Sequence, residues 1–307
     1  MSLSRSPSIR LSLRARLAAG AAACAGALLV ASVATAAPGD APGDPSASAP
    51  KDGEASNADG TVNVLVLRVG GTGSASSAQT YIDALMAVTA RVNGWAAAHG
   101  KYFTSPRLAR TWVTDAKPEY GILSLQAYLA LRESLGLSLL GTVDAVAAGG
   151  QQYFLISVNQ HDLAGCKGKT LATHLGKDTK FVDNVVAGEA FSLADFEVVD
   201  TRRPVKTLKT LLRGEAECAF VDDAQMTALS KLEGADTAQT VWFSATFPSL
   251  IVAKFARTAD ADAKTFAGNL DKVCEGDGAK ACGGAGIEKL AETPAEALDK
   301  LTAKYDG

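Results

Sequence analysis

Few residues in this chain have the types and spacing that catalysis requires. None of the histidines, His99, His161 and His174, has metal-ligand spacing to another, and the chain contains no Gly-x-Ser-x-Gly motif for an activated serine. Asp222 and Asp223 are adjacent carboxylates at the end of a predicted strand. Because neighbours on a strand point to opposite faces, we expect a ligand contact and a helix cap rather than a catalytic pair. The sequence therefore predicts a protein that is not an enzyme, with no catalytic residue, metal or cofactor.

A glycine-rich turn indicates binding instead. The sequence Gly70-Gly71-Thr72-Gly73-Ser74 lies between a predicted buried strand and a long predicted helix. The full dinucleotide-binding pattern fails, because Ser76 stands where the third glycine or alanine belongs. Backbone N–H groups at a helix N-terminus still suit an anionic or polar group of a ligand. A tight turn without a ligand is the alternative.

Charge and composition exclude several classes of protein. The 307 residues include 30 Lys and Arg against 33 Asp and Glu, and 47% of them are hydrophobic. Residues 1–36 contain four arginines and no acid, which leaves 26 basic and 33 acidic groups, a net charge of −7, on the rest of the chain. A net-acidic body has no general attraction for nucleic acid, so we expect no such partner. The length suffices for one large or two medium domains.

The N-terminal residues have the layout of a secretory signal peptide over residues 1–36. A basic start leads into an apolar run, residues 17–33, which closes on Ala34-Thr35-Ala36. The run is too short and too weakly apolar to favour a membrane span. Cys24 lies inside the run rather than after it, which favours export to the periplasm over a lipid tether. Residues 37–60 are rich in Pro, Gly, Ala, Ser and Asp and predict a flexible linker.

Predicted strands and helices alternate through the rest of the chain, and the pattern restarts after Gly149-Gly150. Such alternation is typical of α/β units with parallel sheets. A buried strand over 62–69 precedes a helical stretch that we expect to reach His99. The pattern beyond Ala259 predicts a mainly helical tail. We expect one α/β unit at 61–148, a second at 149–244, and a return to the first unit with C-terminal helices at 245–307.

Four cysteines remain after the predicted export: Cys166, Cys218, Cys274 and Cys282. An even number in an oxidising compartment favours disulfides over metal ligation. Cys274 and Cys282 flank a short loop that can close into a bridge, and Cys166 and Cys218 lie at or just before predicted strands across which they can pair. Buried free thiols and a zinc site are the alternatives, although zinc would normally require spacings that are not present.

The order of four segments resembles the type II periplasmic solute-binding proteins, most of all the phosphate/phosphite/phosphonate-binding family of ABC importers. The resemblance covers about Val62 to Phe255 and is carried by Val64–Gly73, Pro118–Tyr128, Asp162–Ala172 and Leu211–Asp222. One departure concerns the ligand. Phosphonate-binding relatives offer a Ser-Thr-Ser cluster after the strand that enters the second lobe, whereas this chain has no such cluster at 173–179.

The resemblance implies a two-lobed α/β fold of type II, with a mostly parallel sheet flanked by helices in each lobe and a cleft between the lobes. It implies a monomer that captures a small polar or anionic solute in the cleft and delivers it to an ABC transporter permease. The ligand-binding residues that we assign on this basis are Thr72, Gly73, Ser74, Ser124, Tyr128, Thr173, His174 and Asp222.

Alternatives remain for single residues and for the function. Tyr128 also fits a core position of a helix, and His174 also fits an exposed helix start. Ligand sensing for a membrane receptor needs the same cleft as transport, and a secreted enzyme of unrecognised type is the third interpretation.

Overall fold

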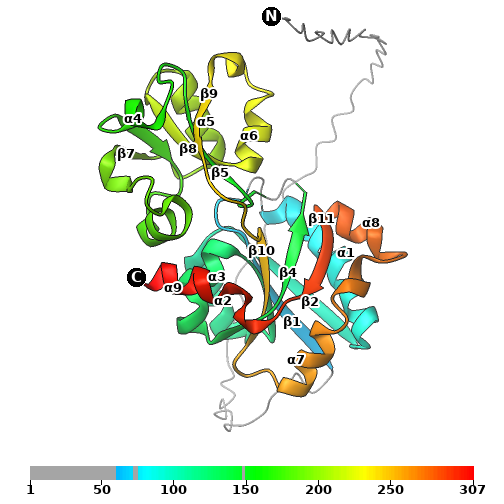
Figure 1. Cartoon of the computed structure of the whole chain (residues 1–307). Coiled ribbons are helices and arrows are strands. Elements are labelled where there is room, and N and C mark those ends of the chain that lie inside the picture. The colour runs from blue at the N-terminus through cyan, green and yellow to red at the C-terminus, as the bar shows by residue number, and fades with distance from the viewer. Residues whose placement is uncertain (1–59, 72–74, 147–148) are drawn as a thin grey trace, which may run out of the picture. The chain divides into compact units, whose positions relative to one another are not determined.

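The computed structural model describes residues 60–71, 75–146 and 149–307 (Figure 1). The predicted signal peptide and almost all of the predicted linker lie outside these residues. Within the described part of the chain, no helix is long and apolar enough to cross a membrane. The described residues form two sheets flanked by helices, which confirms the expected α/β fold with two lobes.

The first lobe is built on a six-stranded sheet with the order β11-β4-β10-β3-β1-β2. Strands β1 to β4 run in one direction, and β10 and β11 run against them. Five of the seven residues of β1 are buried, as expected for a strand covered on both faces. The strands are β1 (Thr61–Leu67), β2 (Ala97–Phe103), β3 (Tyr120–Ser124), β4 (Leu137–Ala145), β10 (Leu250–Phe255) and β11 (Ile287–Glu292).

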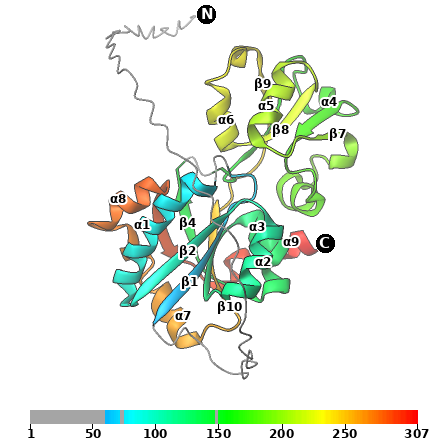
Figure 2. The same cartoon turned by 180° about the vertical axis from the view of Figure 1, so that it is seen from behind.

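Helices cover both faces of this sheet. Figures 1 and 2 show α1 and α8 on one face and α2 and α3 on the other. Two separate groups of buried apolar side chains fill the two faces, because alternate residues of β1 point to opposite sides. The helical elements are α1 (Ala75–Asn93), α2 (Pro106–Ala116), α3 (Leu125–Leu135), α7 (Asp260–Ala267), η4 (Asp271–Cys274), α8 (Gly278–Gly284), η5 (Ala295–Leu298) and α9 (Asp299–Asp306).

The second lobe is built on a five-stranded sheet with the order β7-β6-β8-β5-β9, in which only β5 runs against the other strands. Its strands are β5 (Tyr153–Ser157), β6 (Thr170–Thr173), β7 (Glu197–Asp200), β8 (Cys218–Asp222) and β9 (Gln239–Phe243). Its helical elements are α4 (Leu163–Cys166), the π-helix η1 (Lys180–Ala187), η2 (Leu193–Asp195), α5 (Pro204–Leu212), α6 (Asp223–Leu229) and η3 (Ala235–Thr237).

Two connections join the sheets, from β4 to β5 and from β9 to β10. They are hydrogen-bonded to each other. Phe247 N donates to Gln151 O at 2.8 Å, and Ser244 N donates to Tyr153 O at 2.9 Å. The amide of Gln152 donates to Ser244 O at 2.9 Å. The two crossings therefore form one paired segment between the lobes.

Two expectations about secondary structure were wrong. Helix α1 ends at Asn93 rather than near His99, because Gly94 adopts a left-handed φ of +67° and the next segment pairs with β1 as β2. The tail also contains the strand β11, which the sequence did not predict. A bulge between Ile287 and Lys289 places the buried residues Ile287 and Leu290 three apart, a spacing typical of a helix.

Two disulfides link the cysteines in the pairs considered from the sequence. Cys166 at the end of α4 is bonded to Cys218 at the start of β8, with a Cα–Cα distance of 6.1 Å and a sequence separation of 52 residues. Cys274 and Cys282 are bonded with a Cα–Cα distance of 5.6 Å and a separation of eight residues. The first disulfide is fully buried beside β6 and β8, so it fastens the core of the second lobe.

We predict that the two disulfides contribute unequally to stability. Because the long loop restricts the unfolded chain more, replacing Cys166 and Cys218 with alanine should cost about 4 kcal/mol, against about 2.5 kcal/mol for Cys274 and Cys282. Urea unfolding of both double variants measures the difference. An equal or larger loss in the short-loop variant would contradict the prediction.

Candidate functional site

The carboxyl ends of β1, β3, β6 and β8 border one small cavity. The cavity measures about 20 Å³, room for about one water molecule. Both lobes and the two connections between them contribute to its wall. Its polar side chains are Arg68, Ser124, Gln126, Tyr153, His174, Asp222 and Ser249, and the remaining wall consists of glycines and aliphatic residues. This is the place where ligands bind in open α/β sheets.

On the first-lobe side, the cavity is formed by the segments that follow β1 and β3. Ser124 is the N-cap of α3, and its hydroxyl oxygen accepts hydrogen bonds from Ala127 N and Val69 N, each at 3.4 Å. Both bonds use the oxygen as acceptor, so the O–H of Ser124 can donate to a bound oxygen atom. Arg68 directly follows β1 and contributes the positive charge of this wall.

On the second-lobe side, His174 follows β6 and packs against the glycine turn. Gly70 has a left-handed φ of +73°, and a Cβ at this position would overlap Nε2 of His174. Nδ1 of His174 is buried and has no hydrogen-bond partner among the described residues. Burial lowers the pKa of His174 from 6.5 to about 4, against a smaller opposite effect of Asp200. The imidazole is therefore neutral at pH 7.

Asp222 ends β8 and caps α6. Its carboxylate accepts from Gln225 N at 2.8 Å, and the Gln225 side chain accepts from Asp222 N at 3.1 Å, which completes a capping box. Burial is the largest cause that raises the pKa of Asp222 from 3.8 to about 6, and Asp223 adds to it, whereas hydrogen bonds and Arg68 act in the opposite direction. Asp223 binds the connection between the lobes, because its carboxylate accepts from Gln151 N at 3.0 Å.

The predicted site residues divide into three groups. Ser124, His174 and Asp222 come together at the cavity. Thr173 lies fully buried next to His174, and its hydroxyl accepts from Leu175 N at 3.2 Å, so it shapes the turn after β6. Tyr128 is buried in the core beneath α3 and does not line the cavity. Thr72, Gly73 and Ser74 lie outside the described residues.

Four cavity residues with polar side chains were missed by the sequence analysis: Arg68, Gln126, Tyr153 and Ser249. Arg68 left a usable signal, a single charge at the end of an apolar strand directly before two glycines. Gln126 left only a weak one, a polar residue within an otherwise apolar stretch of α3. The amide of Gln126 donates to Asp178 at 3.2 Å and so connects the first lobe to the second.

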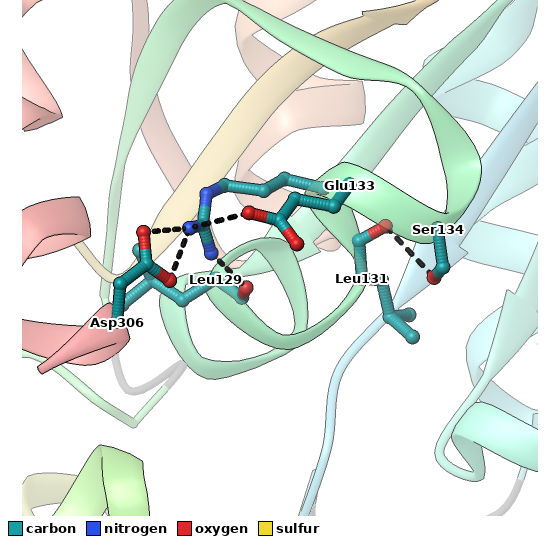
Figure 3. A network of polar contacts seen from close by, with 6 residues as sticks. Leu129, Leu131, Glu133, Ser134 and Asp306 are labelled. Carbon is teal, nitrogen blue, oxygen red and sulfur yellow. Dashed lines mark hydrogen bonds and ion pairs between the residues drawn. The ribbon is translucent and has the colours of Figure 1, made fainter.

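Asp178 also receives a contact from the C-terminal helix. The hydroxyl of Tyr305 in α9 donates to Asp178 at 3.2 Å, and Arg132 of α3 forms ion pairs with Asp306 and Glu133. Figure 3 shows Asp306 and Glu133 with their carboxylates directed at this guanidinium group. Helix α9 therefore connects α3 of the first lobe to the start of η1 in the second.

The described residues bring no three His, Cys, Asp or Glu side chains together as a metal site. The polar groups at the cavity instead combine one guanidinium, three hydroxyls, one amide, one neutral imidazole and one carboxyl group with a raised pKa. Such a set can hold an anion by hydrogen bonds and charge. With Asp222 ionised, it can also hold a hydroxylated or amine-bearing ligand.

Known proteins match this chain in structure but not in sequence. No protein-family model and no curated protein sequence matches it. XAC2383 from Xanthomonas citri, bound to chloride ion, matches at 12% identity over 80% of this chain and 97% of its own, with a TM-score of 0.60. PhnD1 from Prochlorococcus marinus, in complex with methylphosphonate, matches at 6% identity over 81% and 99%, with a TM-score of 0.59.

The periplasmic aliphatic sulphonate binding protein SsuA from Escherichia coli also matches, at 10% identity over 80% of this chain and 86% of its own, with a TM-score of 0.56. At these identities the likeness concerns the fold. The chain thus has the two-lobed type II fold found in periplasmic binding proteins of ABC transporters.

We predict that Asp222 and His174 oppose each other in the pH dependence of stability. The folded state disfavours the ionised form of Asp222, so the contribution of Asp222 to the stability of the fold falls as pH rises from 3.8 past about 6. The folded state also disfavours protonated His174, so the contribution of His174 to the stability of the fold falls as pH drops from 6.5 to about 4.

Substitution should separate the two effects. The change in the free energy of unfolding caused by Asp222→Asn should be more stabilising at pH 8 than at pH 4, by about 2 kcal/mol. The change caused by His174→Gln should instead be more stabilising at pH 4 than at pH 8. Urea unfolding at both pH values measures the differences, with Asp236→Asn on the exposed surface as a control. Parallel pH profiles for all variants would contradict the assignment.

Proposed function

We propose that this chain is an exported solute-binding protein that captures a small anionic or polar solute and delivers it to the permease of an ABC importer. The convergence of polar groups from both lobes on one cavity carries the proposal. The fold shared with transporter binding proteins supports it. In this proposal residues 1–36 direct export to the periplasm and 37–60 are a linker. Residues 61–148 with 245–307 form one lobe, and residues 149–244 form the other.

The charges at the cavity favour an anionic solute. Arg68 is permanently charged and presents a planar set of donors that suits carboxylate, phosphonate and sulfonate groups. Ser124 adds a hydroxyl donor. Asp222 opposes an anion when ionised, but its pKa of about 6 allows protonation in mildly acidic conditions, after which it can donate to the anion. Methylphosphonate, the ligand of PhnD1, is the first candidate of this chemistry.

The size of the cavity requires a movement on binding. A space of about 20 Å³ holds a water molecule but no phosphonate or sulfonate group. Binding must therefore shift the population toward a state with more room between the lobes, and closure around the ligand must follow or accompany it. The contacts that join the lobes at Asp178 are the ones that such a movement has to change.

Ligand binding tests the proposal. Calorimetry and thermal unfolding should be run on the purified chain with methylphosphonate, methanesulfonate, phosphate, phosphite, amino acids and polyamines. A solute at 100 times its Kd should stabilise the fold by about 2.7 kcal/mol. The solute should be recovered unchanged, because the proposed protein has no reaction to catalyse.

The role of Arg68 provides the sharper test. Arg68→Gln should weaken binding of an anionic solute at least about tenfold, because a charge-assisted hydrogen bond is lost. Arg107→Gln on the exposed surface of α2 removes the same charge away from the cavity and should leave affinity unchanged. The anion-binding site is wrong if both substitutions weaken binding equally, or if an anion binds Arg68→Gln as tightly as the unmodified chain.

A further inference from the structure

The first lobe contains a second cavity, of about 290 Å³, beside the small cavity between the lobes. It lies on the face of the sheet that α1 and α8 cover, and Figure 2 shows these two helices next to each other on that face. Most of its wall is apolar. The apolar residues are Val66, Ala78, Ile82, Leu85, Ile122, Val146, Leu250, Ala285 and Ile287, and the aromatic ones are Tyr81 and Tyr102.

The cavity is a pocket that opens to solvent rather than a sealed void, because the exposed side chains of Tyr81 and Val146 line it. Its volume of about 290 Å³ is close to the lower limit of small-molecule sites, about 300 Å³. Apolar walls with a few polar groups are the usual composition of such sites.

Glycines and exposed apolar residues form part of the cavity wall. Tyr81 is 52% exposed and Val146 is 57% exposed, although both are large apolar side chains. A Cβ on Gly284 would lie 3.0 Å from Cδ1 of Tyr81, so a larger residue here would press on the cavity wall. Gly286 has a left-handed φ of +71°, which favours glycine at the turn between α8 and β11.

Arg68 connects this cavity to the one between the lobes. Arg68 and Leu250 line both cavities. Tyr102 contributes a second polar group near Arg68, and Ser77 adds a further polar side chain to the wall. Burial raises the pKa of its hydroxyl and nearby Arg68 lowers it to a lesser extent, so the phenol is protonated at pH 7. The second cavity thus has a cationic end at the cleft and an apolar body within the first lobe.

We propose that the second cavity binds the hydrocarbon part of an amphipathic anion whose head group is held at Arg68. The ligand class is an alkyl or aryl phosphonate, sulfonate or carboxylate. This inference rests on the proposed function, because the head group occupies the cleft that the proposed function assigns to the solute. It adds a subsite in the first lobe that the polar cleft alone does not provide.

Affinity should therefore increase with the length of the apolar chain. Burying one methylene group improves affinity about fourfold. If about half of the chain is buried, octylphosphonate should bind about 100-fold more tightly than methylphosphonate. Octanol has a similar chain without the anionic group and should bind far more weakly than octylphosphonate.

Titration calorimetry of the full chain with methylphosphonate, octylphosphonate and octanol tests the inference, with octanesulfonate and methanesulfonate as a second pair. Ala78→Leu should fill the cavity from α1. It should reduce the ratio of octylphosphonate affinity to methylphosphonate affinity at least about tenfold, while methylphosphonate affinity itself stays unchanged. Ala84→Leu, on an exposed position of the same helix, is the matched control and should preserve the advantage.

The possible failures are distinguishable. If methylphosphonate or methanesulfonate binds and the octyl compounds bind no more tightly, the apolar subsite is wrong and the proposed function stands. If no anion of either length binds, both are wrong. Equal binding of octanol and octylphosphonate, or an unchanged advantage in Ala78→Leu, also overturns the inference, because either result places the chain elsewhere than in the proposed subsite.

Discussion

The paired connections between the two sheets are the constraint on which the rest of the structure depends. Both connections meet the sheets at the edge where the parallel strands end. A strand that starts from this edge must run against its neighbours, which explains why β5 and β10 are reversed within their sheets. Gly149, Gly150 and Ser249 lie on the connections and also line the small cavity. Any group bound there therefore contacts the segment about which the lobes would move.

Burial controls the charge of the cleft through two opposite effects. It is the largest cause of the raised pKa of Asp222 and of the lowered pKa of His174. Both side chains are driven toward their neutral forms, so these two residues add little charge opposite Arg68 between about pH 4 and about pH 6. An anion that neutralises Arg68 would remove one of the effects that lower the pKa of Asp222. Anion binding and protonation of Asp222 therefore favour each other.

The sequence predicted elements well where local chemistry marks their ends. Asp222 and Asp223 at the end of a predicted strand indicated a helix cap, and Asp222 ends β8 and caps α6. It failed where partners distant in the sequence decide the structure. Residues 97–99 of β2, which we expected to be helical, pair with β1, and the bulge in β11 depends on its pairing with β4.

The candidate site follows the same division. Ser124 and Asp222 end β3 and β8, and His174 directly follows β6. The ends of parallel strands share one edge of a sheet, so these predicted residues meet at one place. Gln126 lies within a helix and gains its role only through Asp178 of the other lobe. No local pattern encodes such a contact. Tyr128 fitted the pattern equally well but points into the core, because its helix position faces the sheet.

The two cavities differ in their relation to the lobes, and this difference gives Arg68 a particular position. The cavity between the lobes changes when the lobes move, whereas the apolar cavity lies within one lobe and is lined by it alone. In the proposed arrangement an apolar chain gains the same contacts in open and closed states, and uniform gains shift no equilibrium between them. Only the head group at Arg68 contacts both lobes. Chain length would then set how tightly a solute binds, and the head group would set whether the lobes close on it.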